Sequence, residues 1–212
     1  MEVEILSEKF EMLPQKVLLW KSRKTLLLAD MHLGKINHFR KAGIPVPAKA
    51  NNKNWETLVD LIHSTKPERM ICIGDLFHSH YNSDWEMVGQ FRKNFLQLSI
   101  ELVTGNHDIL SDHQYKRNGI TMHGDGLKFD SILLSHFPVD NPQPGTFTLS
   151  GHLHPGVRLH GKGKQAMTLP CFYFGEQQGY LPAFGVFTGL AKISPKKNDR
   201  IFAIANDSII RV

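Results

Sequence analysis

Cysteine is scarce in this sequence and long hydrophobic runs are missing, and both shortages exclude classes of protein. The two cysteines, Cys72 and Cys171, lie far apart and without CxxC spacing, which argues against a disulfide framework and a thiolate metal site. No run of about 18 apolar residues occurs, so we expect no transmembrane helix and no membrane partner. The first residues, MEVEILSEKFEMLP, do not read as a signal peptide. We therefore expect a cytoplasmic protein with two buried, reduced thiols.

The chain also lacks internal repeats, low-complexity stretches and linkers rich in Gly, Ser or Pro. Its 212 residues, 41% of them hydrophobic, suffice for a buried core, so residues 1–212 are predicted to form a single domain. Lysine and arginine exceed aspartate and glutamate by 25 to 20, a net charge of +5 that favours a polyanionic partner. No alternation of aromatic and basic residues indicates a stacking platform for bases.

Short apolar runs with two or three helices between them dominate the coarse pattern. Strands are predicted at 17–20, 25–29, 70–73, 100–104, 131–135, 146–150, 167–174, 183–187, 201–205 and 209–212, and the last two are expected to pair as a hairpin. The first half alternates strand and helix, whereas the second half is nearly all strand. This mixture predicts an α/β fold of the α+β type, with two packed mixed β-sheets flanked by α-helices.

Two helices are predicted from apolar spacing. Pro47 could open the first, in which Trp55, Leu58, Val59 and Ile62 form an apolar stripe. In the second, Ser83 and Glu86 have the spacing of a capping box, and the apolar stripe behind it consists of Val88, Phe91, Phe95 and Leu98. Both stripes are typical of core packing.

Five apolar runs each end in a polar cluster. The runs end in ADMHLGK, GD, GNHD, SH and GHLHP, which hold Asp30, His32, Asp75, Asn106, His107, Asp108, His136, His152 and His154. Because sites in α/β sheets gather beyond the carboxyl ends of strands, we expect these side chains to converge. In an extended segment residues i and i+2 point the same way, so each D-x-H or H-x-H pair can face one centre.

The residue types indicate a metal site. Two carboxylates, one amide and four imidazoles suit manganese, iron or zinc, and seven ligands are too many for one tetrahedral ion. They suit two ions that share a carboxylate. Gly74, Gly105 and Gly151 each precede a ligand and permit tight turns near the metals.

Taken in order, the motifs DMHLG, GD, GNHD, SH and GHLHP resemble the signature of the calcineurin-like metallophosphoesterase superfamily, from Asp30 to His154. The resemblance implies two divalent ions, with manganese expected first and iron, zinc, nickel or magnesium as alternatives. It places one ion on Asp30, His32, Asp75 and His154, and the other on Asp75, Asn106, His136 and His152. It also implies that His107 is a general acid beside the phosphate, oriented by Asp108.

A narrower resemblance concerns the substrate. ADMHLGK, HFRKAGIPVP and GDLFHS resemble the ligase-associated DNA damage response endonuclease branch. This implies a DNA endonuclease that acts in DNA repair, with a DNA ligase or repair helicase as a partner. The segment GDLFHSH lacks the acidic residue and the arginine of GDxxDRG, which argues against protein dephosphorylation.

The remaining candidates would contact substrate or shape the pocket. Asn106, His107, His78 and Arg40 are predicted to contact substrate. An ordinary, partly exposed histidine accounts equally well for His78, and a solvated basic loop is the more ordinary account of Arg40. The alternative functions are a phosphodiesterase or phosphatase for a small nucleotide-like substrate, and a protein-binding scaffold of the same fold. The scaffold is disfavoured because His107 and all seven ligands are present. An oligomer is compatible with the sequence.

Overall fold

The computed structural model describes residues 1–35, 49–78, 80–161, 163, 165–186 and 188–212. Its first sheet begins as an antiparallel meander and continues as parallel strands, in the order β1-β2-β3-β4-β5-β6-β7. The strands are β1 (Glu2–Ile5), β2 (Glu8–Leu13), β3 (Val17–Trp20), β4 (Thr25–Leu28), β5 (Arg69–Ile73), β6 (Ser99–Val103) and β7 (Ile120–His123). A short 3-10 helix, η1 (Lys21–Arg23), joins β3 to β4. The parallel strands β4, β5 and β6 therefore end at the same edge.

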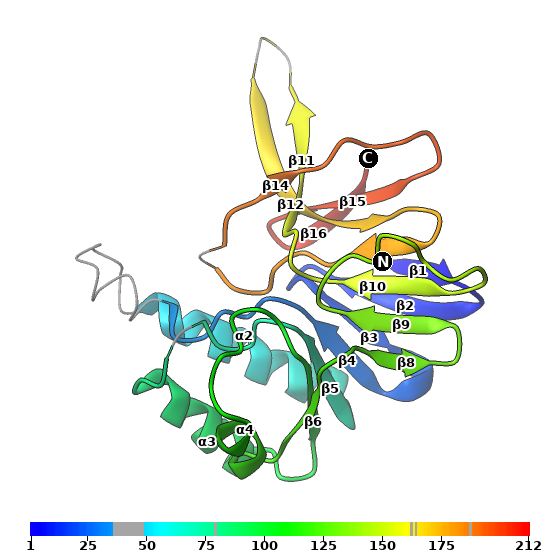
Figure 1. Ribbon diagram of the computed structural model, residues 1–212. Coiled ribbons are helices and arrows are strands. Elements are labelled where there is room, and N and C mark those ends of the chain that lie inside the picture. Colours follow the sequence, from blue (N-terminus) through cyan, green and yellow to red (C-terminus); the bar gives the residue numbers. More distant parts are fainter. Residues whose placement is uncertain (36–48, 79, 162, 164, 187) are drawn as a thin grey trace.

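The second sheet is also mixed and has nine strands in the described part of the chain. They are β8 (Leu127–Phe129), β9 (Ile132–Ser135), β10 (Phe147–Ser150), β11 (Pro155–His160), β12 (Ala166–Phe174), β13 (Gln178–Tyr180), β14 (Ala191–Lys192), β15 (Arg200–Ala205) and β16 (Ser208–Arg211). Strands β9, β10 and β13 are parallel neighbours, whereas β12 pairs antiparallel with β11, β13 and β15. The hairpin of β11 and β12 projects from the body of the molecule (Figure 1).

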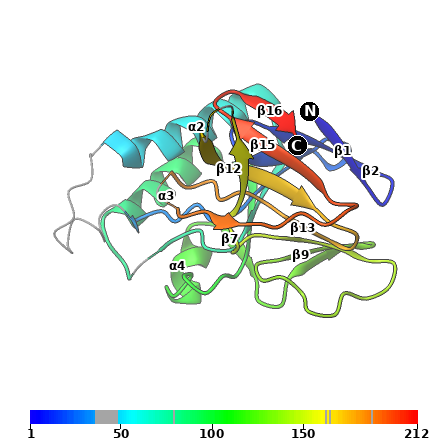
Figure 2. The ribbon, with the colours of Figure 1, turned by 90° about the horizontal axis from the view of Figure 1, so that it is seen from above.

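The layers follow from which faces of the strands are apolar. All four residues of β4 are buried, because its alternate side chains face two different cores. Leu26 and Leu28 pack under the helices α2 (Lys49–Thr65), α3 (Asp84–Asn94) and α4 (Asp112–Arg117). Leu27 packs against the second sheet, beside residues such as Phe172 and Phe174. The three helices thus lie on the first sheet only (Figures 1 and 2), and the predicted class of two packed mixed sheets with flanking helices is confirmed.

Two sequence-based expectations are wrong. Residues 183–186 do not form a strand, since Ala183 makes only an isolated bridge to Ala29. Phe187 and Pro47 lie outside the described residues. The capping box of Ser83 and Glu86 is absent: Ser83 makes no capping bond, and Asn82 Oδ1 accepts the Asp84 N–H at 2.9 Å instead. Glu86 accepts the Tyr81 hydroxyl.

The expectations for the α2 stripe, the C-terminal hairpin and the two thiols are confirmed. The apolar stripe of α2 is packed in the core, with Trp55, Leu58 and Ile62 buried. Strands β15 and β16 form the predicted hairpin. Cys72 and Cys171 are buried and free. None of the described helices is long and apolar enough to cross a membrane.

Candidate metal centre

Five strand ends place the predicted ligands at one edge of the two sheets. Asp30 and His32 follow β4, Asp75 follows β5, and Asn106 follows β6. From the second sheet, His136 follows β9, while His152 and His154 lie between β10 and β11. Because β4, β5 and β6 are parallel, as are β9 and β10, the loops after these strands meet.

The backbone at these ligands is mostly left-handed. Positive φ angles occur at Asp30 (53°), His32 (47°), Asp75 (51°), His152 (64°) and His154 (48°). The extended geometry predicted for the D-x-H and H-x-H pairs is therefore wrong. Residues other than glycine seldom adopt such angles, which cost of order 1–3 kcal/mol and concentrate at functional sites.

Backbone hydrogen bonds tie the loops after β4 and β5 together. The Asp30 N–H donates to Gly74 O at 3.1 Å, and the His32 N–H donates to Asp75 O at 2.9 Å. From the second sheet, the His152 N–H donates to Asp30 Oδ2 at 3.0 Å. These bonds stabilise the left-handed turns and orient one Asp30 oxygen, leaving Oδ1 for another partner.

The potential donor atoms form two overlapping groups. Asp30, His32 and His154 make one, and Asp30, Asp75 and His136 make the other; the ligand atoms within each group lie within 4.8 Å of one another. His154 Nε2 is 3.4 Å from Asp30 Oδ1, and His136 Nε2 is 3.6 Å from Asp75 Oδ2.

The remaining two predicted ligands join the second group. Asn106 Oδ1 lies 3.1 Å from His136 Nε2, and His152 Nδ1 lies 3.2 Å from the same nitrogen. The structure thus brings all seven predicted ligands together. Asp30 belongs to both groups, whereas the resemblance implies Asp75 as the shared carboxylate. Asp75 Oδ2 also lies 3.8 Å from His32 Nε2, so it faces both groups as well, and its bridging role stays a prediction.

The donor set fits divalent ions. Asp30 Oδ1 and His32 Nε2 are buried and have no hydrogen-bond partner, an arrangement that costs several kcal/mol unless another group satisfies them. Burial lowers the pKa of His32 to about 2, and the nearby Lys35 adds to this effect. His32 is therefore neutral, as a metal ligand must be.

Three glycines make the close approach of these ligands possible. A Cβ at Gly74 would lie 1.9 Å from His136 Nδ1, and one at Gly105 would lie 2.3 Å from Asp75 Oδ1. At Gly151 it would lie 2.7 Å from Asp30 Oδ2. Each predicted glycine therefore occupies a position where any side chain would displace a ligand.

Asp108 holds the loops that carry the ligands. Its Oδ2 accepts the N–H groups of Asp75 at 2.8 Å and Gly105 at 2.9 Å, and its Oδ1 accepts the Phe77 N–H at 3.2 Å and the Tyr115 hydroxyl at 3.4 Å. Burial raises the pKa of Asp108 to about 7, against the lowering effect of its backbone hydrogen bonds. These contacts occupy both oxygens, and the predicted orientation of His107 by Asp108 stays a prediction.

His107 lies at the open side of the cluster. Its N–H donates to Asp75 Oδ1 at 2.9 Å, and its half-buried ring lies over His78, with centroids 4.2 Å apart. His78 Nδ1 in turn lies 3.0 Å from His32 Nδ1. Both predicted pocket histidines therefore adjoin the ligands, whereas Arg40 lies outside the described residues.

Two further side chains adjoin the ligands, of which sequence reasoning missed Phe137. The half-exposed Phe137 ring packs on His136 and His152, with both centroid distances 4.7 Å. Lys35 is close enough to Asp75 and Asp30 for their charges to raise its pKa, although burial has the larger, lowering effect. Phe137 directly follows the SH motif and Lys35 ends the ADMHLGK motif, so the sequence position of each gave a signal.

Comparison with known proteins identifies the family of the chain. The family profile of the calcineurin-like phosphoesterases matches residues 23–183. The crystal structure of the Pseudomonas putida nuclease MPE is similar over 100% of this chain and 99% of that chain, with a TM-score of 0.82 and 26% identity. Yfce, a phosphoesterase from E. coli, aligns over 89% of this chain and 97% of its own, with a TM-score of 0.47 and 12% identity. No curated protein sequence matches the chain. The chain belongs to the calcineurin-like phosphoesterase family.

Proposed function

We propose that this protein is a metal-dependent nuclease that hydrolyses phosphodiester bonds in DNA with two divalent ions, manganese first among them. The observation that carries the proposal is the pair of overlapping donor groups around the buried Asp30. Two such groups suit a two-ion centre better than a single tetrahedral ion. The general activity, phosphoester hydrolysis, follows from the family.

The residues divide into two sets of ligands. Asp30, His32, Asp75 and His154 would hold one ion, and Asp75, Asn106, His136 and His152 would hold the other. When bound, the ions supply Lewis-acid stabilisation of the negative charge that develops on the phosphoryl oxygens.

His107 supplies the proton chemistry in this proposal. Its backbone is fixed by the bond to Asp75, and its ring lies at the open side of the cluster beside His78. From there it can donate a proton to the leaving oxygen, and general acid catalysis of this kind contributes about 10²–10⁴ in rate. Asp108 keeps the loop of His107 in register with Asp75 through its hydrogen bonds.

DNA as the substrate is supported by three observations. The solved structure with a TM-score of 0.82 is described as a nuclease, and the net charge of +5 favours a polyanion. Asn106 and His152 are exposed, so the donor groups can be reached from solvent. A role in cytoplasmic DNA repair beside a DNA ligase or repair helicase rests only on the resemblance of the motif sequences.

A manganese-dependent assay tests the proposal. It compares bis-p-nitrophenyl phosphate, p-nitrophenyl phosphate and plasmid DNA, with and without chelator. We expect cleavage of the diester and of DNA. We expect His107→Ala to lower cleavage of DNA, whose leaving alkoxide needs a proton, by about 10²–10⁴ while metal content is kept. The control is His113→Ala, which alters an exposed histidine of α4.

Each other outcome selects a different function. Preference for the monoester would favour a phosphatase for small substrates. Absence of any chelator-sensitive activity would favour the scaffold. Full activity of His107→Ala on an unactivated diester would overturn its role as general acid.

A further inference from the structure

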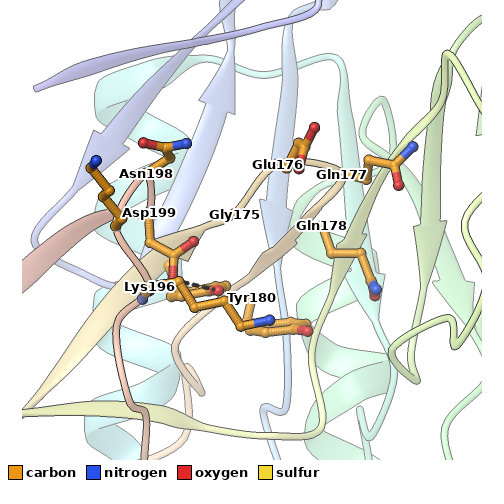
Figure 3. Close-up of a pocket in the computed structure, with 10 residues that line it drawn as sticks. Gly175, Glu176, Gln177, Gln178, Tyr180, Lys196, Asn198 and Asp199 are labelled. Carbon is orange, nitrogen blue, oxygen red and sulfur yellow. Dashed lines mark hydrogen bonds between the residues drawn. The ribbon is translucent and has the colours of Figure 1, made fainter.

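The outer face of the second sheet has a hollow of about 390 Å³. Tyr173 of β12 and Tyr180 of β13 form part of its lining, together with Gln177, Gln178, Lys196 and Asp199 (Figure 3). The inner face of the sheet is marked by Phe174 and Leu149, which belong to the core between the sheets. Neither tyrosine belongs to that core, and no described helix covers them. The hollow is thus separate from the metal ligands.

The two tyrosines form an aromatic stack. They are directly opposite on neighbouring strands, and their rings stack with centroids 5.0 Å apart and an interplanar angle of 8°. The Tyr173 hydroxyl donates to Asp199 Oδ2 at 2.8 Å, and the Lys196 N–H donates to the same oxygen at 2.7 Å. The pair is therefore held in place, and both rings are only half-buried.

Two lysines and two acids line the hollow, Lys196 and Lys197 against Glu176 and Asp199. Asp199 is one of the two acids and is already hydrogen-bonded, and Glu176 is the other. Figure 3 shows the Lys196 side chain extending toward Tyr180, with Glu176 on the opposite side. A phosphate beside Lys196 and Lys197 would thus avoid Glu176.

Tyr180, one of the residues that line the hollow, lies near a predicted metal ligand. Tyr180 pairs with Ser150 of β10, which is two residues before the predicted ligand His152. Strand spacing and chain geometry put the Cα atoms of Tyr180 and His152 within about 12 Å of each other. A single nucleic-acid strand that occupies the metal centre can bridge that separation.

We propose that this hollow binds one nucleotide of a single-stranded segment next to the cleaved phosphodiester. The base stacks on Tyr180, and Lys196 and Lys197 contact the flanking phosphates, a combination typical of single-strand binding. The strand is single because a base that stacks on a side chain has left its duplex. The inference rests on the proposed nuclease function, which it extends by naming where the substrate is gripped.

Binding of a fluorescein-labelled oligothymidylate to the full-length protein, measured by anisotropy with chelator present, tests the inference without cleavage. We expect Tyr180→Ala to weaken binding about tenfold or more and Tyr180→Phe to preserve it. The double variant Lys196→Ala/Lys197→Ala should lower the slope of log K against log salt by about 0.7 for each lost phosphate contact. The matched control Lys9→Ala/Lys93→Ala removes the same charge from β2 and α3.

The small diester separates this inference from the proposed function. Bis-p-nitrophenyl phosphate is too short to reach the hollow, so its turnover should be unchanged in Tyr180→Ala. Wild-type oligonucleotide binding by both Tyr180→Ala and the Lys196/Lys197 variant would overturn the inference and leave the nuclease proposal intact. Selective weakening of binding, in a protein that cleaves no DNA, would instead overturn the nuclease and keep the binding site. If Tyr180→Ala has a lowered melting temperature, binding by the variant of the exposed Lys196 and Lys197 tests the inference instead.

Discussion

Replacing Gly74 by alanine should damage the metal centre through a single added methyl group. Gly74 has φ +80°, and its Cβ would lie 1.9 Å from His136 Nδ1 and 2.3 Å from His136 Cγ. The ring has little freedom to move, because His136 is 1% exposed and lies between Ile73 and Asn106. The collision therefore displaces a predicted ligand.

Two costs add in this variant. A side chain in the left-handed region costs about 1–2 kcal/mol, and overpacking a filled site costs about 1–3 kcal/mol. We expect Gly74→Ala to lower the free energy of unfolding by about 2–5 kcal/mol. Gly145 is the matched control, since it has φ +75° and nothing within 4 Å of its added Cβ. Gly145→Ala should incur only the first cost, about 1–2 kcal/mol.

Urea unfolding in chelator measures both variants, and manganese titration with bis-p-nitrophenyl phosphate turnover measures the centre. We expect Gly74→Ala to bind metal about 10–100-fold more weakly, as when a group that positions a ligand is lost. Gly145→Ala should bind metal and turn over substrate like the wild type. Equal stability of the two variants, with full metal binding by Gly74→Ala, would refute the reasoning.

Three further changes probe the ligands, their support and the core. Asp75→Asn should lose metal and diesterase activity together, because Asp75 faces both donor groups. Two metals per chain retained in elemental analysis of this variant would contradict the role of Asp75 as the carboxylate shared by both ions. Asp108→Ala leaves three backbone N–H groups without their acceptor and should lower the free energy of unfolding in urea by at least about 3 kcal/mol. Tyr115→Phe removes one hydroxyl and should lower it by about 1 kcal/mol or less. Equal losses in the two variants would contradict the role of Asp108 in holding the loops. Burial raises the pKa of Cys171 to about 12 and that of Cys72 well above its ordinary value. A thiol reagent at pH 8 should therefore label both cysteines rapidly only when urea unfolds the protein. Rapid labelling of the folded protein would show that the two thiols are accessible.

The sequence predicted the strands that are apolar on both faces. Strands such as β4 and β5 are buried throughout and read as continuous apolar runs. Strands β1 and β2 were missed because their buried residues, such as Val3 and Phe10, alternate with charged residues in short segments. β1 is the edge strand of the sheet, and β2 lies next to it. The apolar segment at 183–187 was wrongly predicted as a strand, because burial there comes from loop packing. Ala183 and Phe184 are buried, but they pack beside the Asp30 loop and join no ladder.

The candidate site was predictable in its membership but not in its local geometry. The polar clusters at the ends of five predicted strands identified the seven ligands, because parallel strands end at the same edge of a sheet. The left-handed backbone at Asp30 or His154 depends on hydrogen bonds between loops, which spacing alone does not reveal. The stack of Tyr173 on Tyr180 was likewise hidden, since their pairing across two strands gives no periodic pattern in the sequence.

At the metal ligands with left-handed backbone, thermal stability and catalytic activity favour different residues. At each such position glycine would relieve the backbone strain, which is about 1–2 kcal/mol per residue, while removing the donor atom. A library selected only for survival at high temperature should therefore enrich sequences that have lost their histidines and aspartates here. Engineering a more thermostable variant of this protein therefore requires selection for catalytic activity as well as for stability.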